Sequence, residues 1–440
     1  MSTPLQAPPT VIAEPAARSG LTARIARATR ILAAYFTAQV LTQGLNAVAG
    51  LLLVNILPVR EFALYALATS FLTFFTVASD LGSTSSLVYF YRHAQEHNEP
   101  FARYLAAVRA LRRAAFGAGV VVVVAAFLPA AHAKGFTSFE SGAALAAILV
   151  AVGAHIFSAL GLMSLRLHHR YRQSYVAEAV AAATRLALVV GLAVLGWTLG
   201  WAAIWTAAAA GLACALLAQD PEAAAIGPAT WADIRQLLRY LTPSLPSAAY
   251  FAIQGPLVIW LATSFGSTTN IAQVGALGRL GVVVGIFGGM TSILFLPRLA
   301  HTRSDREFIS RYLQFGALLV VIGSSLVALA WRFPDLLLAL LGRNYHGLPR
   351  ELLLVIIGSA LTLLSGYAVG VNLSRAWNRW ETLAVGVLFL SQATFVAVLP
   401  MSSTAGVLRF QVLSGVVGLL LQLAITAVGL RRPEWMKSVK

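Results

Sequence analysis

Long apolar segments separated by short polar connections make up most of the chain. Each apolar segment reaches the roughly 20 residues that an α-helix needs to cross a bilayer, and none shows the strict alternation of a transmembrane β-strand. The pattern therefore predicts an all-α polytopic membrane protein with about 12 transmembrane helices. The expected spans are 30–57, 62–91, 111–131, 142–165, 174–196, 199–218, 237–264, 272–297, 312–331, 350–372, 381–400 and 405–429.

Composition and charge agree with this class. Only 11% of the 440 residues are charged, whereas a soluble domain carries roughly 25%. The net charge of +16 is unevenly placed, because 24 of the 32 Lys and Arg residues fall in alternate connections and only 5 in the others. This is the positive-inside asymmetry of membrane proteins, so the basic charge reports topology and not a nucleic-acid partner. We expect a bacterial-type cytoplasmic (inner) membrane, with both termini cytoplasmic.

A connection containing Pro, Gly and acidic residues divides the spans into two groups of six. Weak similarity between "EFALYALATSF" and "NIAQVGALGRL", which open the second span of each half, favours two parallel repeats. The expected organisation is a disordered cytoplasmic tail (1–28), an N-terminal six-helix lobe (29–218), a cytoplasmic connection (219–236), a C-terminal six-helix lobe (237–430) and a basic cytoplasmic tail (431–440).

Polar residues recur at helical spacing inside three spans. In the second span Thr69, Thr73, Thr76 and Asp80 share one face, and a carboxylate facing lipid near the bilayer centre would cost roughly 2.5–3.5 kcal/mol. Either Asp80 lines a hydrated interior, or it ends its helix and caps a short following one. Interhelical hydrogen bonding explains any single stripe, but three together favour a shared hydrated interior. The other stripes are Gln39, Gln43 and Asn46 in the first span and Gln411, Gly415, Gly418, Gln422 and Thr426 in the last.

Two arginines inside spans are candidates for binding an anion. Arg185 lies two turns after Glu178 on the same face, so an ion pair between them and a substrate contact are both open. Arg279 points away from a row of glycines spaced every fourth residue, which predicts a close-packed face. A cavity-lining guanidinium suits phosphate, because its planar fork donates two parallel hydrogen bonds. The glycines are Gly281, Gly285 and Gly289.

Enzymatic and metal-binding signals are missing from the sequence. Cys214 is the only cysteine, so neither an internal disulfide nor a thiolate metal cluster can form. No glycine-rich phosphate loop, metal-spaced histidines or paired external carboxylates occur. His155 lies within a span and could join a proton relay or simply pack. We therefore expect a transporter without cofactor or metal, in which Asp80, His155 and Glu178 are the candidates for coupling to protons or sodium.

Several segments resemble the polysaccharide-flippase (Wzx-type) branch of the multidrug/oligosaccharidyl-lipid/polysaccharide (MOP) exporter superfamily. They cover, in order, nearly the whole chain after the N-terminal tail. The segments are "EFALYALATSFLTFFTVASDLGSTSSLVYFYR", "LLRYLTPSLPSAAYFAIQ", "SFGSTTNIAQVGALGRL" and "FPDLLLALLGRNYHGLPRELLLVIIGSALTLLSG".

The resemblance implies two six-helix lobes related by a pseudo-two-fold axis, with a central cavity for a polyprenyl-pyrophosphate-linked oligosaccharide. It also implies lobes that rock to expose this cavity to each side in turn, often coupled to an ion gradient. Asp80 in "SDLGS" corresponds to a similar position of the family, whereas Gln254 stands where many relatives carry an acid.

A flippase of lipid-linked glycans is therefore the expected function. Its expected partners are the substrate, membrane lipids and the polymerase or glycosyltransferase machinery, with the monomer as the working unit. An antiporter of small organic cations is one alternative, but Asp80 is the only central carboxylate it could use. A membrane glycosyltransferase or ligase is the other, and it would need external acids or a large external loop. The expected cavity residues are Gln39, Gln43, Asn46, Thr73, Thr76, Asp80, Arg185, Gln254 and Arg279.

Overall fold

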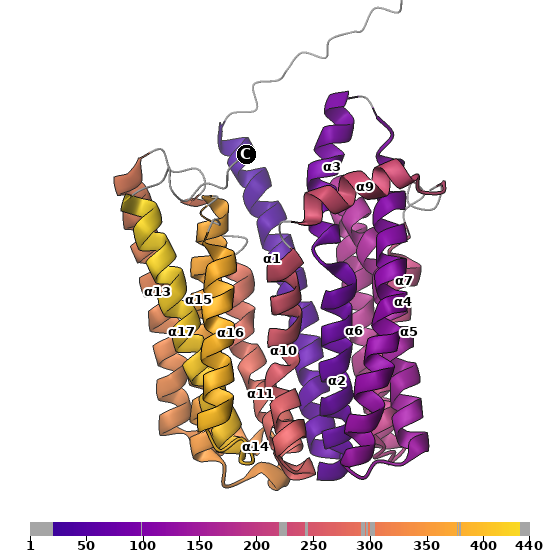
Figure 1. Ribbon diagram of the computed structural model, residues 1–440, viewed down its shortest axis with the longest axis vertical. Helices are drawn as coiled ribbons and strands as arrows, with labels where there is room; N and C mark the ends of the chain where they lie inside the picture. The colour runs from indigo at the N-terminus through magenta and orange to yellow at the C-terminus, as the bar shows by residue number, and fades with distance from the viewer. Residues whose placement is uncertain are drawn as a thin grey trace, which may run out of the picture.

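The computed structural model describes residues 21–97, 99–219, 227–242, 245–291, 295, 298–299, 304–375, 377 and 380–431. Within them the chain is helical, and twelve long helices run between two ends of the molecule (Figure 1). Eleven of these are long and apolar enough to cross a membrane, and α11 is the twelfth. The predicted all-α polytopic fold is confirmed.

The long helices form two groups of six, one from each half of the chain. The first group is α1 (Leu21–Ile56), α2 (Val59–Asp80), α4 (Phe101–Ala133), α5 (Ser138–Leu167), α6 (Tyr171–Val194) and α7 (Gly200–Leu217). The second is α10 (Leu245–Phe265), α11 (Thr268–Met290), α13 (Asp305–Arg332), α15 (Pro349–Ser374), α16 (Glu381–Val398) and α17 (Thr404–Arg431). The shorter elements are α3 (Ser83–His97), α9 (Trp231–Leu241), α14 (Pro334–Ala339) and a 3₁₀ turn (Arg343–Tyr345).

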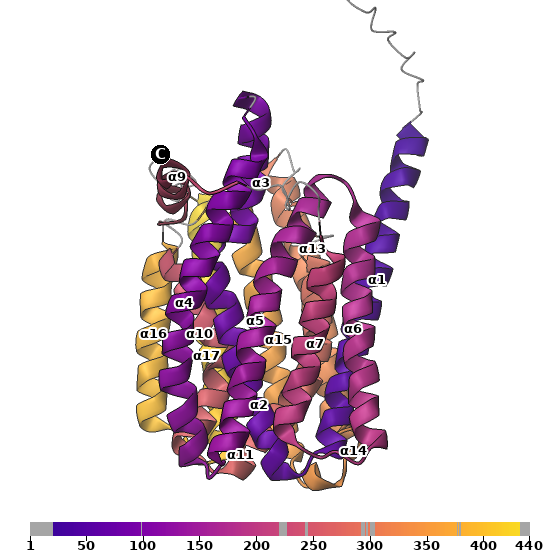
Figure 2. The same cartoon turned by 90° about the vertical axis from the view of Figure 1, so that its right-hand side faces the viewer.

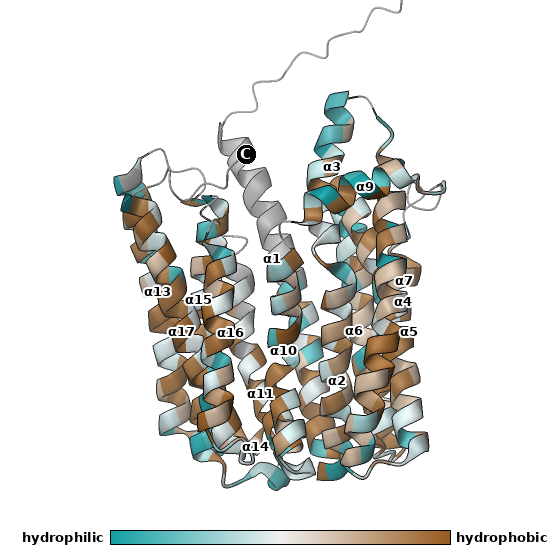
Figure 3. Ribbon diagram, in the orientation of Figure 1, coloured by the Kyte–Doolittle hydropathy of each residue, from teal (hydrophilic) through white to brown (hydrophobic). Residues whose placement is uncertain are grey.

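The two ends of the bundle differ in the connections they carry. One end, here called the basic end, holds α3, α9, the connection at 168–170, the end of α15 and the start of α16, and it lies at the top of Figure 1. The opposite end holds the connections at 57–58, 134–137, 195–199, 266–267 and 399–403, together with α14. Hydrophilic residues gather on α3 and α9, while hydrophobic ones predominate along the long helices (Figure 3).

The second expected span is interrupted within 62–91. Helix α2 ends at Asp80, Leu81 and Gly82 take positive φ angles of 45° and 78°, and α3 begins at Ser83. The Asp80 carboxylate accepts hydrogen bonds from the Thr84 backbone N–H at 3.2 Å and the Ser83 hydroxyl at 3.3 Å. It thereby satisfies donors at the start of α3 that have no partner within the helix. The single span expected at 62–91 is therefore two helices, and the Asp80 carboxylate caps the second one, which is one of the two interpretations left open by the sequence.

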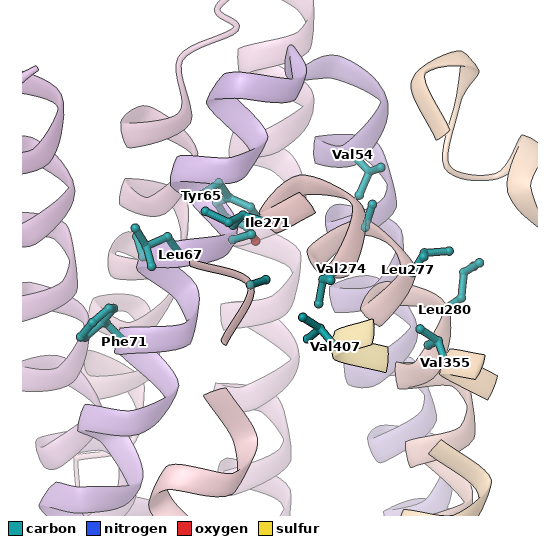
Figure 4. Close-up of a cluster of buried hydrophobic side chains, with 14 of the residues drawn as sticks. Val54, Tyr65, Leu67, Phe71, Ile271, Val274, Leu277, Leu280, Val355 and Val407 are labelled. Atoms are coloured by element: carbon teal, nitrogen blue, oxygen red, sulfur yellow. The ribbon is translucent and has the colours of Figure 1, made fainter. Parts of the chain in front are cut away.

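Helix α2 lies at the centre of the contact between the lobes, packed on α10 and α11. Its apolar face meets the α11 residues Ile271 and Val274 (Figure 4). Gly275 permits the approach, since a Cβ there would lie 2.7 Å from the Cβ of Ala66. The Trp260 indole of α10 donates to the Ser70 hydroxyl at 3.1 Å. Small residues such as Gly275 and Ala66 let membrane helices pack closely.

The lobes also contact each other at the opposite end. The Asn55 side chain donates to the Leu340 carbonyl at 2.9 Å, and the Lys134 ammonium donates to the Gly266 carbonyl at 2.6 Å. The buried ring of Tyr345 lies edge-on to Phe62, with centroids 6.2 Å apart. These contacts join connections of one lobe to those of the other and close the opposite end.

Helix α9, between the lobes in the chain, packs against α4 of the first lobe. Figure 1 shows α9 lying across the basic end, and Figure 2 shows α1 beside α6 at the edge of the bundle. Leu237 and Leu241 are buried beneath α9, and Trp231 on its other side is exposed. Arg103 holds the helix through Asp233, with Nε and Nη2 at 2.8 Å and 2.7 Å from Oδ1.

We predict that Asp233→Asn loosens α9. Burial acts to raise the pKa of Asp233, but hydrogen bonds from Thr230 and from the Arg103 guanidinium outweigh it and hold the pKa below its ordinary 3.8. A lowered pKa stabilises the docked helix above the unfolded-state value of about 3.9 and is lost as pH falls through the folded value. Hydrogen exchange at pH 7 should show α9 amides protected about 1 kcal/mol less in the variant, given the half-exposed arginine. Equal protection would contradict this role.

Candidate functional site

The largest cavity described, called the main cavity here, has a volume of about 720 Å³. It is lined by α1, α2, α4, α5, α6 and α7, with Ala248 and Phe251 of α10 completing one wall. Its lining lies toward the basic end of these helices, as in 72–80 of α2, 151–166 of α5 and 207–214 of α7. A polar cavity thus reaches from the middle of the bundle toward the basic end.

Most site residues expected from the sequence line this one cavity. They come from four helices and are Gln39, Gln43, Asn46, Thr76, Asp80, His155, Glu178 and Arg185. Thr73 and Arg279 instead line a second cavity of about 390 Å³ beside α11. Gln254 lines neither of the two, because its side-chain amide exchanges hydrogen bonds with that of Gln392 at 3.0 Å and 2.9 Å.

Arg112 is a cavity residue that the sequence pattern did not predict. From the sequence Arg112 is counted among the charges of a basic connection, at the very start of the expected span 111–131, but α4 already begins at Phe101 and the Arg112 side chain is fully buried. Its Nη1 donates to the Ile156 carbonyl at 3.4 Å, and its Nη2 lies 3.3 Å from Asp80 Oδ1. Its Nε has no hydrogen-bond partner among the described residues. Its burial could have been inferred from the helical spacing that puts Arg112 on the same face as the apolar residues Leu105 and Val108.

Asp80 therefore has two roles at once. It caps α3 and faces the cavity beside Arg112, with a side chain about one-third exposed. The two interpretations left open by the sequence are both present in the structure. A helix interrupted inside a membrane is tolerated where it lines a cavity, and the break at Leu81–Gly82 lines the main cavity.

Arg185 is held by neutral groups. Its Nη1 donates to Asn46 Oδ1 at 3.0 Å and its Nη2 to the Tyr65 hydroxyl at 2.8 Å, while Nε has no hydrogen-bond partner among the described residues. The ion pair between Arg185 and Glu178 that the sequence left open does not form here, because the Glu178 carboxylate accepts a hydrogen bond from Arg166 Nη2 at 2.6 Å. Each Nη nitrogen carries a second N–H that these two bonds do not use, so Arg185 keeps donor capacity beyond its buried Nε.

Arg279 reaches the same tyrosine from the other lobe. Its guanidinium carbon lies 5.3 Å from the ring centroid of Tyr65, which is fully buried. Gly50 of α1 leaves room for it, since a Cβ there would meet Arg279 Cδ at 3.3 Å. One phenol therefore contacts a guanidinium from each lobe, Arg185 of α6 and Arg279 of α11. Arg185 lines the main cavity and Arg279 lines the second one.

The charges of the main cavity favour an anion. Its lining includes three arginines and two carboxylates. Asp80 faces Arg112 and Glu178 pairs with Arg166, but Arg185 has no carboxylate partner in the described part of the chain. An unpaired guanidinium at membrane depth needs water or an anion around it. The surplus of positive charge fits a phosphate-bearing ligand and opposes an organic cation.

Comparison with solved structures identifies the fold. An inward-closed structure of the lipid II flippase MurJ matches with a TM-score of 0.71 and 13% identity, covering 89% of this chain and 87% of that one. An inward-facing multidrug-resistance MATE transporter of the MOP superfamily matches with 0.62 and 16% identity, covering 90% and 96%. The chain has the MOP transporter fold. The outward-facing MATE structure gives 0.51 at 16% identity, covering 90% and 94%.

The sequence itself also matches a known family over part of its length. Residues 29–219, which span the first MOP lobe, match the family model described as "Polysaccharide biosynthesis protein". No curated protein matches the chain. The resemblance inferred from the sequence is confirmed at this level, as a match of 29–219 to the polysaccharide biosynthesis family and a MOP transporter fold, and the matched region contains the helices that contribute most of the main cavity.

We predict that Asp80→Asn destabilises the protein through Arg112. Asparagine keeps an oxygen for capping α3 but leaves the buried guanidinium without its counter-charge. Removing one partner of a buried pair costs about 3–5 kcal/mol, and the partial exposure of Asp80 reduces this to about 1–3 kcal/mol. Thermal unfolding in detergent should show the loss, and adding Arg112→Met should recover part of it. Additive losses in the double variant would contradict the pairing. Glu96→Gln, in an exposed pair with Arg92, serves as the neutral control.

Proposed function

We propose that this protein is an alternating-access flippase for a polyprenyl-pyrophosphate-linked oligosaccharide, a precursor of a surface polysaccharide or O-antigen. The observation that carries the proposal is the arginine-lined main cavity, in which Arg185 has donor capacity and no carboxylate partner. The match of the first lobe to polysaccharide biosynthesis proteins supports a glycan cargo. The shared fold with the lipid II flippase supports a lipid-linked one.

The chemistry of such a head group fits the lining. Taking a charged, hydroxyl-rich group through hydrocarbon without replacement of its hydration costs many kcal/mol. Guanidinium groups replace water around pyrophosphate through charge-assisted hydrogen bonds. Amides and hydroxyls such as Gln39, Gln43 and Thr76 can do the same for sugar hydroxyls. The lipid tail then stays in the bilayer while only the head group enters the cavity.

The orientation follows from charge. The positive-inside asymmetry assigns the basic end, and with it both termini, to the cytoplasm of a bacterial-type inner membrane. The main cavity then lies on the cytoplasmic side, and the inter-lobe contacts of Asn55, Lys134 and Tyr345 close the external side. Greater similarity to the inward-facing than to the outward-facing MATE structure supports this assignment. Loading of substrate would occur in this conformation.

Ion coupling completes the proposal. Asp80, His155 and Arg112 all line the main cavity, so binding of a proton to Asp80 or His155 would change the charge that the pyrophosphate meets. Glu178 is the weaker candidate, because Arg166 already neutralises it. Among the described residues no group of three or more acidic, His or Cys side chains forms a metal site. The proposed partners are the lipid-linked glycan, membrane lipids and the polymerase or glycosyltransferase machinery, with one chain as the transport unit.

The test is leaflet exchange of a fluorescent polyprenyl-pyrophosphate-linked sugar in proteoliposomes. We predict that Arg185→Ala slows exchange at least tenfold, because a hydrogen bond to a charged group contributes about 1.5–3 kcal/mol. Arg185→Lys should recover only part of the rate, since lysine lacks the planar fork. Arg409→Ala, an exposed arginine of α17 outside both cavities, is the matched control. Wild-type rates in Arg185→Ala, at equal reconstitution, would refute the phosphate role.

A further inference from the structure

A second polar space begins between α2 and α11 and extends into the second lobe. The cavity of about 390 Å³ beside α11 adjoins one of about 370 Å³ between α11, α15 and α17, and Gly281, Ser359 and Gln411 line both. We call the two together the C-lobe cavity. Each part is within the range of roughly 300–1,000 Å³ typical of ligand pockets.

The lining of the C-lobe cavity differs in kind from that of the main cavity. Among the described residues it consists of hydroxyls, one amide, glycines, apolar side chains and one arginine, without a carboxylate. That arginine, Arg279, belongs to the part that adjoins α2. Further from Arg279 the lining is uncharged, and its polar members are Thr291, Ser359, Thr362, Tyr367 and Gln411.

Two of these polar side chains have unused hydrogen-bonding capacity. Thr362 and Tyr367 bond to the carbonyls of Gly358 and Tyr312, but Ser359 and Gln411 form no hydrogen bond within the described part of the chain. Polar groups inside a membrane protein require a partner. Water or a ligand in the cavity must therefore supply it.

Glycine keeps this space open. A Cβ added at Gly285 or at Gly366 would have no atom within 4 Å, although both residues line the cavity. At Gly281, by contrast, a Cβ would lie 2.7 Å from the Ser359 hydroxyl. The close-packed row expected from the sequence therefore holds at Gly281 and fails at Gly285, while the side-chain surroundings of position 289 lie outside the described residues. At Gly285 the absence of a side chain leaves open space in the cavity and does not serve a close contact with another helix.

One buried residue, Tyr65, links the two cavities, although it lines neither of them. Tyr65 accepts a hydrogen bond from Arg185 of the main cavity, and its ring faces Arg279 of the C-lobe cavity. A pyrophosphate held near this pair would direct what is attached to it into the C-lobe cavity. Uncharged hydroxyls and amides in that cavity match sugar rings without charge.

We propose that the C-lobe cavity is a glycan subsite that binds uncharged sugar residues distal to the one attached to pyrophosphate. The inference rests on the proposed function and extends it to the substrate class, a neutral oligosaccharide of several sugars. The subsite selects for the length of the glycan, whereas the arginines hold the pyrophosphate common to all such substrates.

The experiment compares two fluorescent substrates in proteoliposomes, a polyprenyl-pyrophosphate carrying one sugar and one carrying four neutral sugars. Gly285→Val and Gly366→Val insert bulk where no atom lies within 4 Å of the new Cβ. We expect exchange of the four-sugar substrate to fall at least tenfold and that of the one-sugar substrate to change less than twofold. Gly386→Val in α16, also without neighbours and outside the C-lobe cavity, should leave both rates unchanged.

A labelling measurement separates loss of binding from misfolding. In a Cys214→Ala background, which removes the only native cysteine, Gly285→Cys is labelled with a water-soluble thiol reagent. The four-sugar lipid should protect this cysteine and the one-sugar lipid should not. Equal protection by both, or equal exchange of both in Gly285→Val, overturns the subsite while leaving the flippase intact. If the wild-type protein exchanges neither substrate, the proposed function fails and the subsite with it.

Discussion

A guanidinium group inside a membrane must be surrounded by water, a counter-ion or hydrogen-bond acceptors, and this requirement organises the first lobe. Arg112 is fully buried beside Asp80, Arg166 is paired with Glu178, and Arg185 has only the neutral Asn46 and Tyr65. Facing lipid would be costly for each of them. The main cavity is the space that keeps these groups out of hydrocarbon, and its surplus positive charge follows directly from their number.

A hydrated cavity in a membrane protein is compatible with a barrier only if one side of it is closed. Here the closure lies at the end opposite the basic connections, where α2 packs tightly on α10 and α11. Ala66 and Gly275 permit that close approach, and Asn55 and Lys134 add hydrogen bonds between the lobes. These contacts are few and specific. The proposed alternating access would require these contacts to be exchanged as a unit.

The sequence predicted the helices and most of the main cavity because membrane helices obey strong local rules. Span length fixed the twelve helices, and the 3.6-residue period placed Gln39, Gln43 and Asn46 on the face that lines the cavity. The sequence could not decide whether Asp80 caps a helix or lines a cavity, because the break at Leu81–Gly82 allows Asp80 to do both.

Other features depend on which helices become neighbours, and one sequence does not contain that information. From the sequence Arg112 counts as a charge of a connection, whereas α4 begins at Phe101 and carries Arg112 as a buried helical residue. Gln254 finds its partner Gln392 on α16, 138 positions later in the chain. Glycines spaced every fourth residue predict close helix packing, yet the open space beside Gly285 depends on where α15 and α17 lie.

The central claim is that one cavity serves the two sides of the membrane in turn. Spin-label pairs measured by double electron–electron resonance test it most directly, with Gln95 and Arg306 labelled across the basic end and Ser138 and Ser402 across the opposite end, all four exposed. On adding a polyprenyl-pyrophosphate-linked oligosaccharide to reconstituted protein, the account predicts a population with a shorter distance across the basic end and a longer one across the opposite end. Distances that stay constant, or that change in the same direction at both ends, would contradict it.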